Sequence, residues 1–157
     1  MRSDIGTLSV PADVQTVGSG EASHGAAQYQ QMKAAVFKAL VENNGCHTFI
    51  IEGDFGGALK VDRYINGGDG TAEEAVAEIG FAIYRTQEMA DLVEWMRSYN
   101  ESASNEKALH FYGMDVQRFD NNKEYLFSVL DQTCPELSAE YSGSLAQLTD
   151  ACSPKEE

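Results

Sequence analysis

Three short segments rich in apolar residues are separated along this chain by longer amphipathic ones. The short segments are VQTV at 14–17, CHTFII at 46–51 and LHFYG at 109–113. Each is too short for a buried helix, so each is predicted to be a strand. The order strand, helix, strand, helix, strand is typical of a parallel sheet with helical crossovers. The pattern predicts an α/β fold, either an open sheet or part of a barrel.

The intervening segments carry apolar residues at helical spacing. In residues 26–43 they recur every three or four positions, and NNG at 43–45 provides a helix stop. Thr71 and Glu74 fit a capping box, which starts a helix at Ala72. Further helices are expected over 58–65, 86–101, 122–132 and 136–150, and a glycine-rich loop over 53–57. Residues 1–157 are treated as one domain, and 119–157 are expected to be helical.

The composition excludes several classes of protein. A formal net charge of -14 argues against a nucleic-acid partner, which needs an excess of Lys and Arg. The three cysteines have no regular spacing and indicate neither a disulfide framework nor a zinc site. The chain begins without the apolar core of a signal peptide, and no apolar run is long enough to span a bilayer. We therefore expect a cytoplasmic protein that binds neither nucleic acid nor membrane.

The segment GSGEASHG at 18–25 places a carboxylate and an imidazole in a glycine-rich turn ahead of a helix. The strands of a parallel sheet finish at one edge, and sites form there. The first predicted strand leads to Glu21 and His24, the second ends at Glu52, and the third ends at Asp115. Three carboxylates and one imidazole are therefore expected in a single crevice.

Such a cluster has two chemical uses. A histidine held by a carboxylate is a general base that activates water for attack on an electrophilic carbon. The same four side chains could instead hold a divalent metal ion with a bound hydroxide. Spacing alone leaves both open. A purely structural interpretation also stands, in which Glu21 or Ser23 is an ordinary N-cap of the following helix.

Other residues receive a role from their position. Arg85 lies just before a predicted helix and is expected to pair with the carboxylates or to hold an anionic group. Arg97 lies about three turns further along and is assigned to a structural ion pair, and Trp95 to packing. His47 and His110 lie within or at the start of strands, and we interpret both as structural.

Five segments resemble the erythromycin esterase family and occur in the family's order. They are GEASHG at 20–25, FIIEGDF at 49–55, VDRYINGG at 61–68, YRTQEMADLVEWMRSYN at 84–100 and FYGMDVQ at 111–117. The first is similar to the family's GEATHG box, and the fourth to its W-x-T-x-E-x-x-x-L-x-x-W-L-R-x-Y-N block. The likeness covers residues 14–118.

This resemblance implies an α/β hydrolase that cleaves carboxylic esters. The best-known members inactivate macrolide antibiotics by opening the macrolactone ring, with no cofactor and no metal. By motif, His24 is the general base, Glu21 orients it, and Glu52 positions the water. Arg85 and Asp115 shape the substrate pocket. The implied partner is a small-molecule ester such as a macrolide.

Two departures from the family pattern matter. The residues GSG at 18–20 replace the apolar ones expected before the first box. Family members are also much longer, and their second half contributes another active-site histidine. We therefore expect this chain to correspond to the N-terminal portion of the family fold. There are two alternatives. The chain could be a non-catalytic remnant, or it could be a metal-dependent hydrolase whose ligands are His24, Glu21, Glu52 and Asp115.

Overall fold

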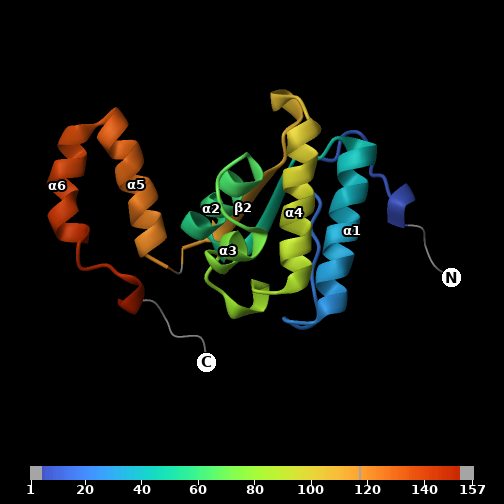
Figure 1. Cartoon of the computed structure of the whole chain (residues 1–157), viewed down its shortest axis with the longest axis horizontal. Helices are drawn as coiled ribbons and strands as arrows, with labels where there is room; N and C mark the ends of the chain where they lie inside the picture. Colours follow the sequence, from blue (N-terminus) through green and yellow to red (C-terminus); the bar gives the residue numbers. More distant parts are fainter. Residues whose placement is uncertain (1–4, 117, 153–157) are drawn as a thin grey trace.

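A two-stranded parallel sheet lies at the centre of this protein, with helices packed against it (Figure 1). The computed structural model describes residues 5–116 and 118–152. The helices are α1 (Ala27–Asn44), α2 (Phe55–Ile65), α3 (Ala72–Ala77), α4 (Gln87–Ser102), α5 (Asp120–Thr133) and α6 (Pro135–Leu145), the strands are β1 (Thr48–Asp54) and β2 (His110–Asp115), and short 3-10 turns are η1 (Ile5–Thr7), η2 (Ala82–Tyr84), η3 (Asn105–Lys107) and η4 (Asp150–Cys152). The α/β class with parallel strands and helical crossovers is confirmed. Among the described residues, no helix is both long and apolar enough to cross a membrane.

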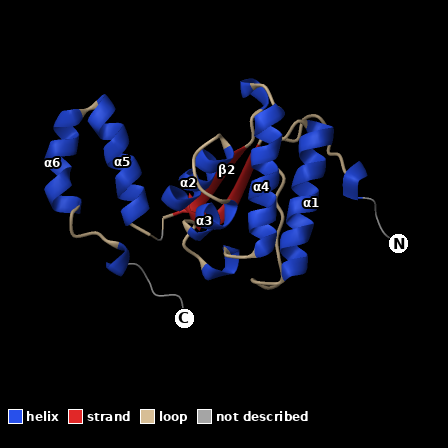
Figure 2. Cartoon of the chain, in the orientation of Figure 1, coloured by secondary structure: helices blue, strands red, loops and turns tan. Residues whose placement is uncertain are grey.

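The two faces of the sheet have different surroundings. Phe49 on β1 lies opposite Phe111 on β2, and both rings belong to the apolar cluster that packs against α1 and α4. Figure 2 shows α1 and α4 side by side next to the strands. Alternate residues of a strand point to opposite faces, so Ile50 and Met114 point away from this core. These two side chains are 55% and 71% exposed, so the second face of the sheet is open.

Local sequence signals account for several helix ends. Helix α1 ends where Gly45 adopts a left-handed φ of 66°. The backbone N–H groups of Gly45 and Cys46 donate to the carbonyls of Val41 and Leu40, respectively. Helix α3 begins with the predicted capping box: Glu74 N–H donates to Thr71 Oγ1 at 3.2 Å, and Thr71 N–H donates to Glu74 Oε2 at 3.0 Å. Both predictions are confirmed.

The structural roles predicted on α4 are also observed. Arg97 donates to the carbonyl oxygens of Tyr64 at 3.0 Å and Gly68 at 2.7 Å, and its Nε lies 3.6 Å from Glu101. Trp95 packs against aromatic rings of α1 and α4. Both side chains therefore tie α4 to its neighbours.

The strand predicted over 14–17 is not formed. A strand needs a neighbour for its backbone groups, and in the part of the chain that the structure describes β1 pairs with β2 and not with residues 14–17. The N-terminal segment is bound instead by helix α1, where the Asn44 side chain accepts from the N–H of Val10 at 3.1 Å and donates to its carbonyl at 2.8 Å. Residues 14–17 therefore run as exposed, irregular chain beside the sheet.

The glycine-rich loop predicted over 53–57 is also wrong, because β1 continues to Asp54 and α2 begins at the next residue. Asp54 is fully buried and caps α2 by accepting from Gly57 N–H at 2.9 Å. A Cβ at Gly57 would collide with the carbonyl oxygen of Glu78. The glycines here permit close packing of α2 against the chain that follows α3, and no loop is needed.

The last two helices form a hairpin at one end of the molecule, where α5 contacts α2 (Figure 1). They were predicted over 122–132 and 136–150, and the second ends earlier, at Leu145. Helix α5 buries no residue fully, and it is held by an edge-on contact between the rings of Tyr125 and Phe55 at 5.8 Å and by polar contacts. Asp54 accepts from Arg118 N–H at 3.0 Å and from Asn122 Nδ2 at 2.7 Å, and Asp150 binds the Arg118 guanidinium at 2.5 Å.

Candidate active site

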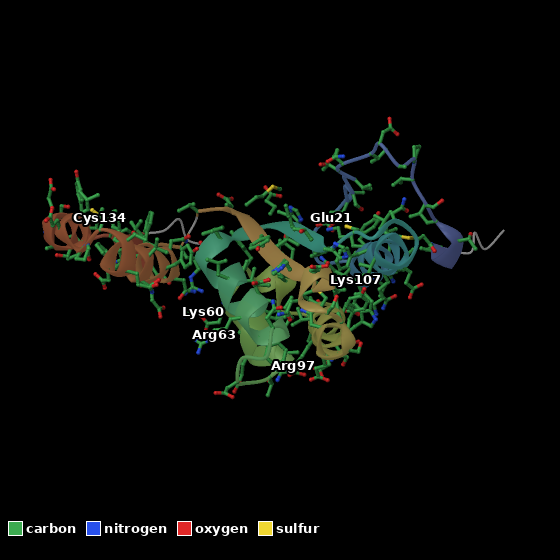
Figure 3. The ribbon with its side chains drawn as sticks, turned by 90° about the horizontal axis from the view of Figure 1, so that it is seen from above. Glu21, Lys60, Arg63, Arg97, Lys107 and Cys134 are labelled. Carbon is green, nitrogen blue, oxygen red and sulfur yellow. The ribbon has the colours of Figure 1, made fainter. Side chains whose placement is uncertain are left out.

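A cavity of about 640 Å³ lies beside β1, between this strand, helix α1 and the irregular N-terminal segment. Its walls are largely apolar, with Val14, Phe37 and Ile50 among them. Six residues with titratable side chains also line it: Glu21, His24, Lys33, Cys46, Glu52 and Tyr84. Figure 3 shows Glu21 near one side of the molecule and Lys60, Arg63 and Arg97 on the other.

Glu21 bridges a histidine and a lysine. Its Oε1 lies 2.6 Å from His24 Nδ1, and its Oε2 accepts a hydrogen bond from Lys33 Nζ at 2.6 Å. The Glu21 and Lys33 side chains are only 9% and 18% exposed, whereas that of His24 is 60% exposed. The carboxylate is thus fixed on both oxygens, and the imidazole that it holds faces solvent.

The charge on Glu21 is stabilised by its partners. The Lys33 ammonium, hydrogen-bonded to Glu21, holds the pKa of that carboxyl below its ordinary value. Burial opposes this shift of the pKa, and His24 adds to it. Glu21 is therefore ionised at neutral pH. A carboxylate beside Nδ1 favours the tautomer with hydrogen on Nδ1, which leaves Nε2 as the basic nitrogen of His24.

The turn that carries His24 is set by glycine. Gly25 has a left-handed φ of 79°, which lets the chain reverse between His24 and the start of α1. The N-cap position of α1 is Ala26, and no side chain caps it. Neither Glu21 nor Ser23 therefore serves as the N-cap, and the N-cap interpretation of this segment is wrong. Ser23 Oγ donates to the His24 carbonyl at 3.3 Å.

Glu52 enters the same cavity from the end of β1. The backbone carbonyl of Glu52 accepts a hydrogen bond from the Tyr84 hydroxyl at 3.1 Å. Burial raises the pKa of Tyr84 to about 12, and the negative charges of Glu21 and Glu52 contribute to the rise of this pKa. Two carboxylates and a neutral phenol thus share one wall with the histidine.

Two of the predicted site residues lie elsewhere. Neither Arg85 nor Asp115 is among the described residues that line the cavity. The Arg85 side chain donates to the Gly80 carbonyl at 3.0 Å, and Asp115 Oδ1 accepts from Val116 N–H at 2.8 Å. The structure thus brings together Glu21, His24 and Glu52.

The predicted metal-ligand set is not assembled. Within residues 5–116 and 118–152, no group of three or more His, Cys, Asp or Glu side chains is placed to hold a metal ion. Glu21 is already engaged on both oxygens by His24 and Lys33. The described residues therefore do not fit a metal centre.

The sequence analysis gave no role to Lys33 or Tyr84. Lys33 had a usable signal, because it falls within the apolar stripe of α1, at helical spacing from Tyr29, Phe37 and Leu40. A lysine on a packed face needs a counter-charge, and Glu21 is that charge. Tyr84 had no comparable signal, since its contact joins residues 32 apart in the sequence.

Sequence comparison connects this geometry to known proteins. The family model of erythromycin esterase matches residues 41–157. The chain belongs to the erythromycin esterase family. It is 27% identical over 114 residues to erythromycin esterase type II of Escherichia coli, which covers 73% of this chain and 26% of that protein. The GEASHG segment at 20–25 precedes the residues that the family model matches.

Two solved structures resemble the fold. A Bacillus cereus protein superimposes with a TM-score of 0.69 and 27% identity, over 81% of this chain and 30% of that one. A succinoglycan biosynthesis protein superimposes with a TM-score of 0.73 and 29% identity, over 87% of this chain and 34% of that one. The chain therefore spans between a quarter and about a third of the length of these relatives.

Proposed function

We propose that this chain carries the water-activating part of a carboxylic ester hydrolase, with His24 as the general base. The observation that supports this most directly is Glu21, which bridges His24 and Lys33 at 2.6 Å on each side, on the wall of a cavity. Family membership supports the class of reaction.

The proposed reaction uses one water molecule. Nε2 of His24 takes a proton from water while the water oxygen bonds to the ester carbonyl carbon. The bond from that carbon to the alkoxy oxygen then breaks, and His24 returns the proton to the alkoxide. The products are a carboxylic acid and an alcohol, or a ring-opened hydroxy acid if the ester is a lactone.

Glu21 and Glu52 have separate roles in this proposal. Glu21 holds the His24 ring and stabilises the imidazolium that forms when the proton is taken, as a buried carboxylate does beside a catalytic histidine. Glu52 positions the attacking water from the end of β1. Because Arg85 and Asp115 do not line the cavity, the proposal gives them no contact with the reacting atoms. No step requires a metal ion.

We propose a macrolactone as the substrate, because the Escherichia coli relative is named for erythromycin. The cavity offers largely apolar walls and few charges, which suits a large ester of low polarity. The closed ester ring of such a compound gives a simple readout, because hydrolysis adds one water and releases no fragment.

Mass spectrometry tests this proposal. The 157-residue protein and its His24→Ala variant are each incubated with erythromycin, with and without EDTA, and the compound is examined for the gain of one water. We expect the gain with the native protein in both buffers and not with the variant. No gain with the native protein would refute the proposal for this chain. A gain that EDTA abolishes would refute the metal-free reaction, and a gain that survives His24→Ala would refute the role of His24.

A further inference from the structure

The end of β1 that carries Glu52 is irregular. Ile51 pairs with Gly113 and Asp54 with Asp115, so three steps along β1 match two steps along β2. Glu52 therefore lies within this shift of register, which we call the β1 bulge. Bulges next to active sites change the direction in which a side chain leaves the strand. The bulge is thus the backbone feature that determines how Glu52 enters the cavity.

Tyr84 contacts this bulge directly. Its hydroxyl donates to the Glu52 carbonyl oxygen at 3.1 Å, from the end of the η2 turn. The Tyr84 side chain belongs to the buried core, and its ring meets that of Phe81 edge-on at 6.3 Å. The hydroxyl is therefore held in place by packing, and it fixes a carbonyl within the irregular part of the strand.

The Tyr84 hydroxyl is suited to donate a hydrogen bond at all working pH values. Burial, together with the nearby charges of Glu21 and Glu52, raises the pKa of Tyr84 to about 12. The phenol consequently keeps its proton throughout the range in which an ester hydrolase with a histidine base would work. A base or nucleophile would need the opposite shift of its pKa.

We infer that Tyr84 is a positioning residue, whose hydroxyl holds the β1 bulge and thereby sets the position of the Glu52 carboxylate in the cavity. The effect on rate rests on the proposed function, in which Glu52 positions the water. The effect on the position of Glu52 does not depend on that function, so the two can be measured separately.

The experiment compares Tyr84→Phe with Tyr64→Phe in the full chain. Each change removes one hydroxyl from a buried tyrosine and keeps the ring. Tyr64 is 6% exposed and Tyr84 4%, and Tyr64 donates its hydrogen to Glu94 at 2.6 Å, away from the cavity. Tyr64→Phe is therefore a matched control for the loss of a buried hydroxyl.

The first measurement is NMR of the side-chain carboxyl carbons in protein labelled with ¹³C at glutamate, with the Glu52 signal assigned by its loss in Glu52→Gln. Tyr84→Phe is expected to move this signal, together with the amide signals of residues 52–54. Tyr64→Phe is expected to move none of them. An unchanged Glu52 signal in folded Tyr84→Phe would overturn the inference, whatever the catalytic activity.

The second measurement is the rate of erythromycin hydrolysis. Tyr84→Phe is expected to lower kcat about fivefold, the effect of losing one neutral hydrogen bond, with KM little changed. In a Glu52→Gln background the same change is expected to cause no further loss, because it acts through Glu52. An equal loss in both backgrounds would overturn the inference. A native chain without activity would refute the proposed function and leave the NMR result to decide the role of Tyr84.

Discussion

Within the described residues, two histidine–carboxylate pairs have different surroundings. In the first, His24 Nδ1 lies 2.6 Å from Glu21, the other carboxylate oxygen binds Lys33, and the imidazole lines a cavity. In the second, His110 Nδ1 lies 3.2 Å from Asp62, and the same Asp62 oxygen accepts the backbone N–H of the next residue in β2 at 2.9 Å. His110 also stacks on Tyr112, with their rings 6.0 Å apart.

The contrast shows that a histidine beside a carboxylate does not define a site by itself. Asp62 uses its oxygen to fix the backbone at the start of β2, so its pair with His110 is part of the sheet's support. Glu21 makes no such backbone contact among those described, and instead joins two ionisable side chains on the wall of a cavity. The Lys33 ammonium and the adjoining cavity distinguish the Glu21–His24 pair from the Asp62–His110 pair.

Removal of each histidine is the strongest test of this distinction. We expect His24→Ala to reduce kcat for erythromycin hydrolysis at least about 10²-fold, the usual contribution of a general base. His110→Ala is expected to leave kcat unchanged. Both are measured by the rate of water addition, with circular dichroism to verify folding. Equal losses would show that the two pairs do not differ in function.

Removal of the lysine tests whether the cation matters. Lys33→Met keeps the length of the side chain and leaves Glu21 without its ammonium partner, and we expect kcat to fall about tenfold, as for the loss of one charged hydrogen bond. Lys123→Met is the control, because Lys123 has a similar side-chain exposure, 20% against 18%, and pairs with Asp120 on the distant α5. If both variants kept full activity, Lys33 would have no part in the site.

The second pair is expected to affect stability instead. Asp62→Ala removes the acceptor of a backbone N–H in β2, and we expect the free energy of unfolding to fall by about 1 kcal/mol. Urea denaturation measures this loss, and kcat of the folded variant should be unchanged. A change in kcat with unchanged stability would assign Asp62 to the site and contradict the contrast.

Much of the fold could be predicted from local sequence signals. The capping box at Thr71 and the glycine stop after α1 act within a few residues, so the sequence was sufficient to place these helix ends. The strand over 14–17 failed because a strand depends on a neighbour far away in the chain. The loop over 53–57 failed because glycine also permits close packing, as at Gly57 against Glu78, and composition alone does not separate the two uses.

The candidate site was predicted in part for the same reason. His24 and Glu21 are three residues apart, and their contact follows from a short turn. Glu52 follows from the rule that parallel strands end at one edge. Asp115 satisfies that rule as well, but it is not among the described residues that line the cavity, although its neighbour Met114 at the end of β2 is. The position of a cavity depends on side-chain packing across the whole domain, which the order of the strands does not determine.

The smallest expected effect is a change in the free energy of unfolding at acid pH. The lowered pKa of Glu21 means that the folded state holds this carboxylate ionised more firmly than the unfolded state does. The stability that Glu21 contributes is therefore complete above its ordinary pKa of 4.5, and is lost as the pH falls through the lower folded-state pKa. We expect the unfolding free energies of native protein and Glu21→Gln to differ by a constant amount above pH 4.5 and to converge below it. Urea denaturation at a series of pH values measures this difference. A difference that stayed constant down to the most acid sample would show that Lys33 and His24 do not stabilise the charge on Glu21. The Glu21–His24 pair would then no longer differ from the Asp62–His110 pair in this respect.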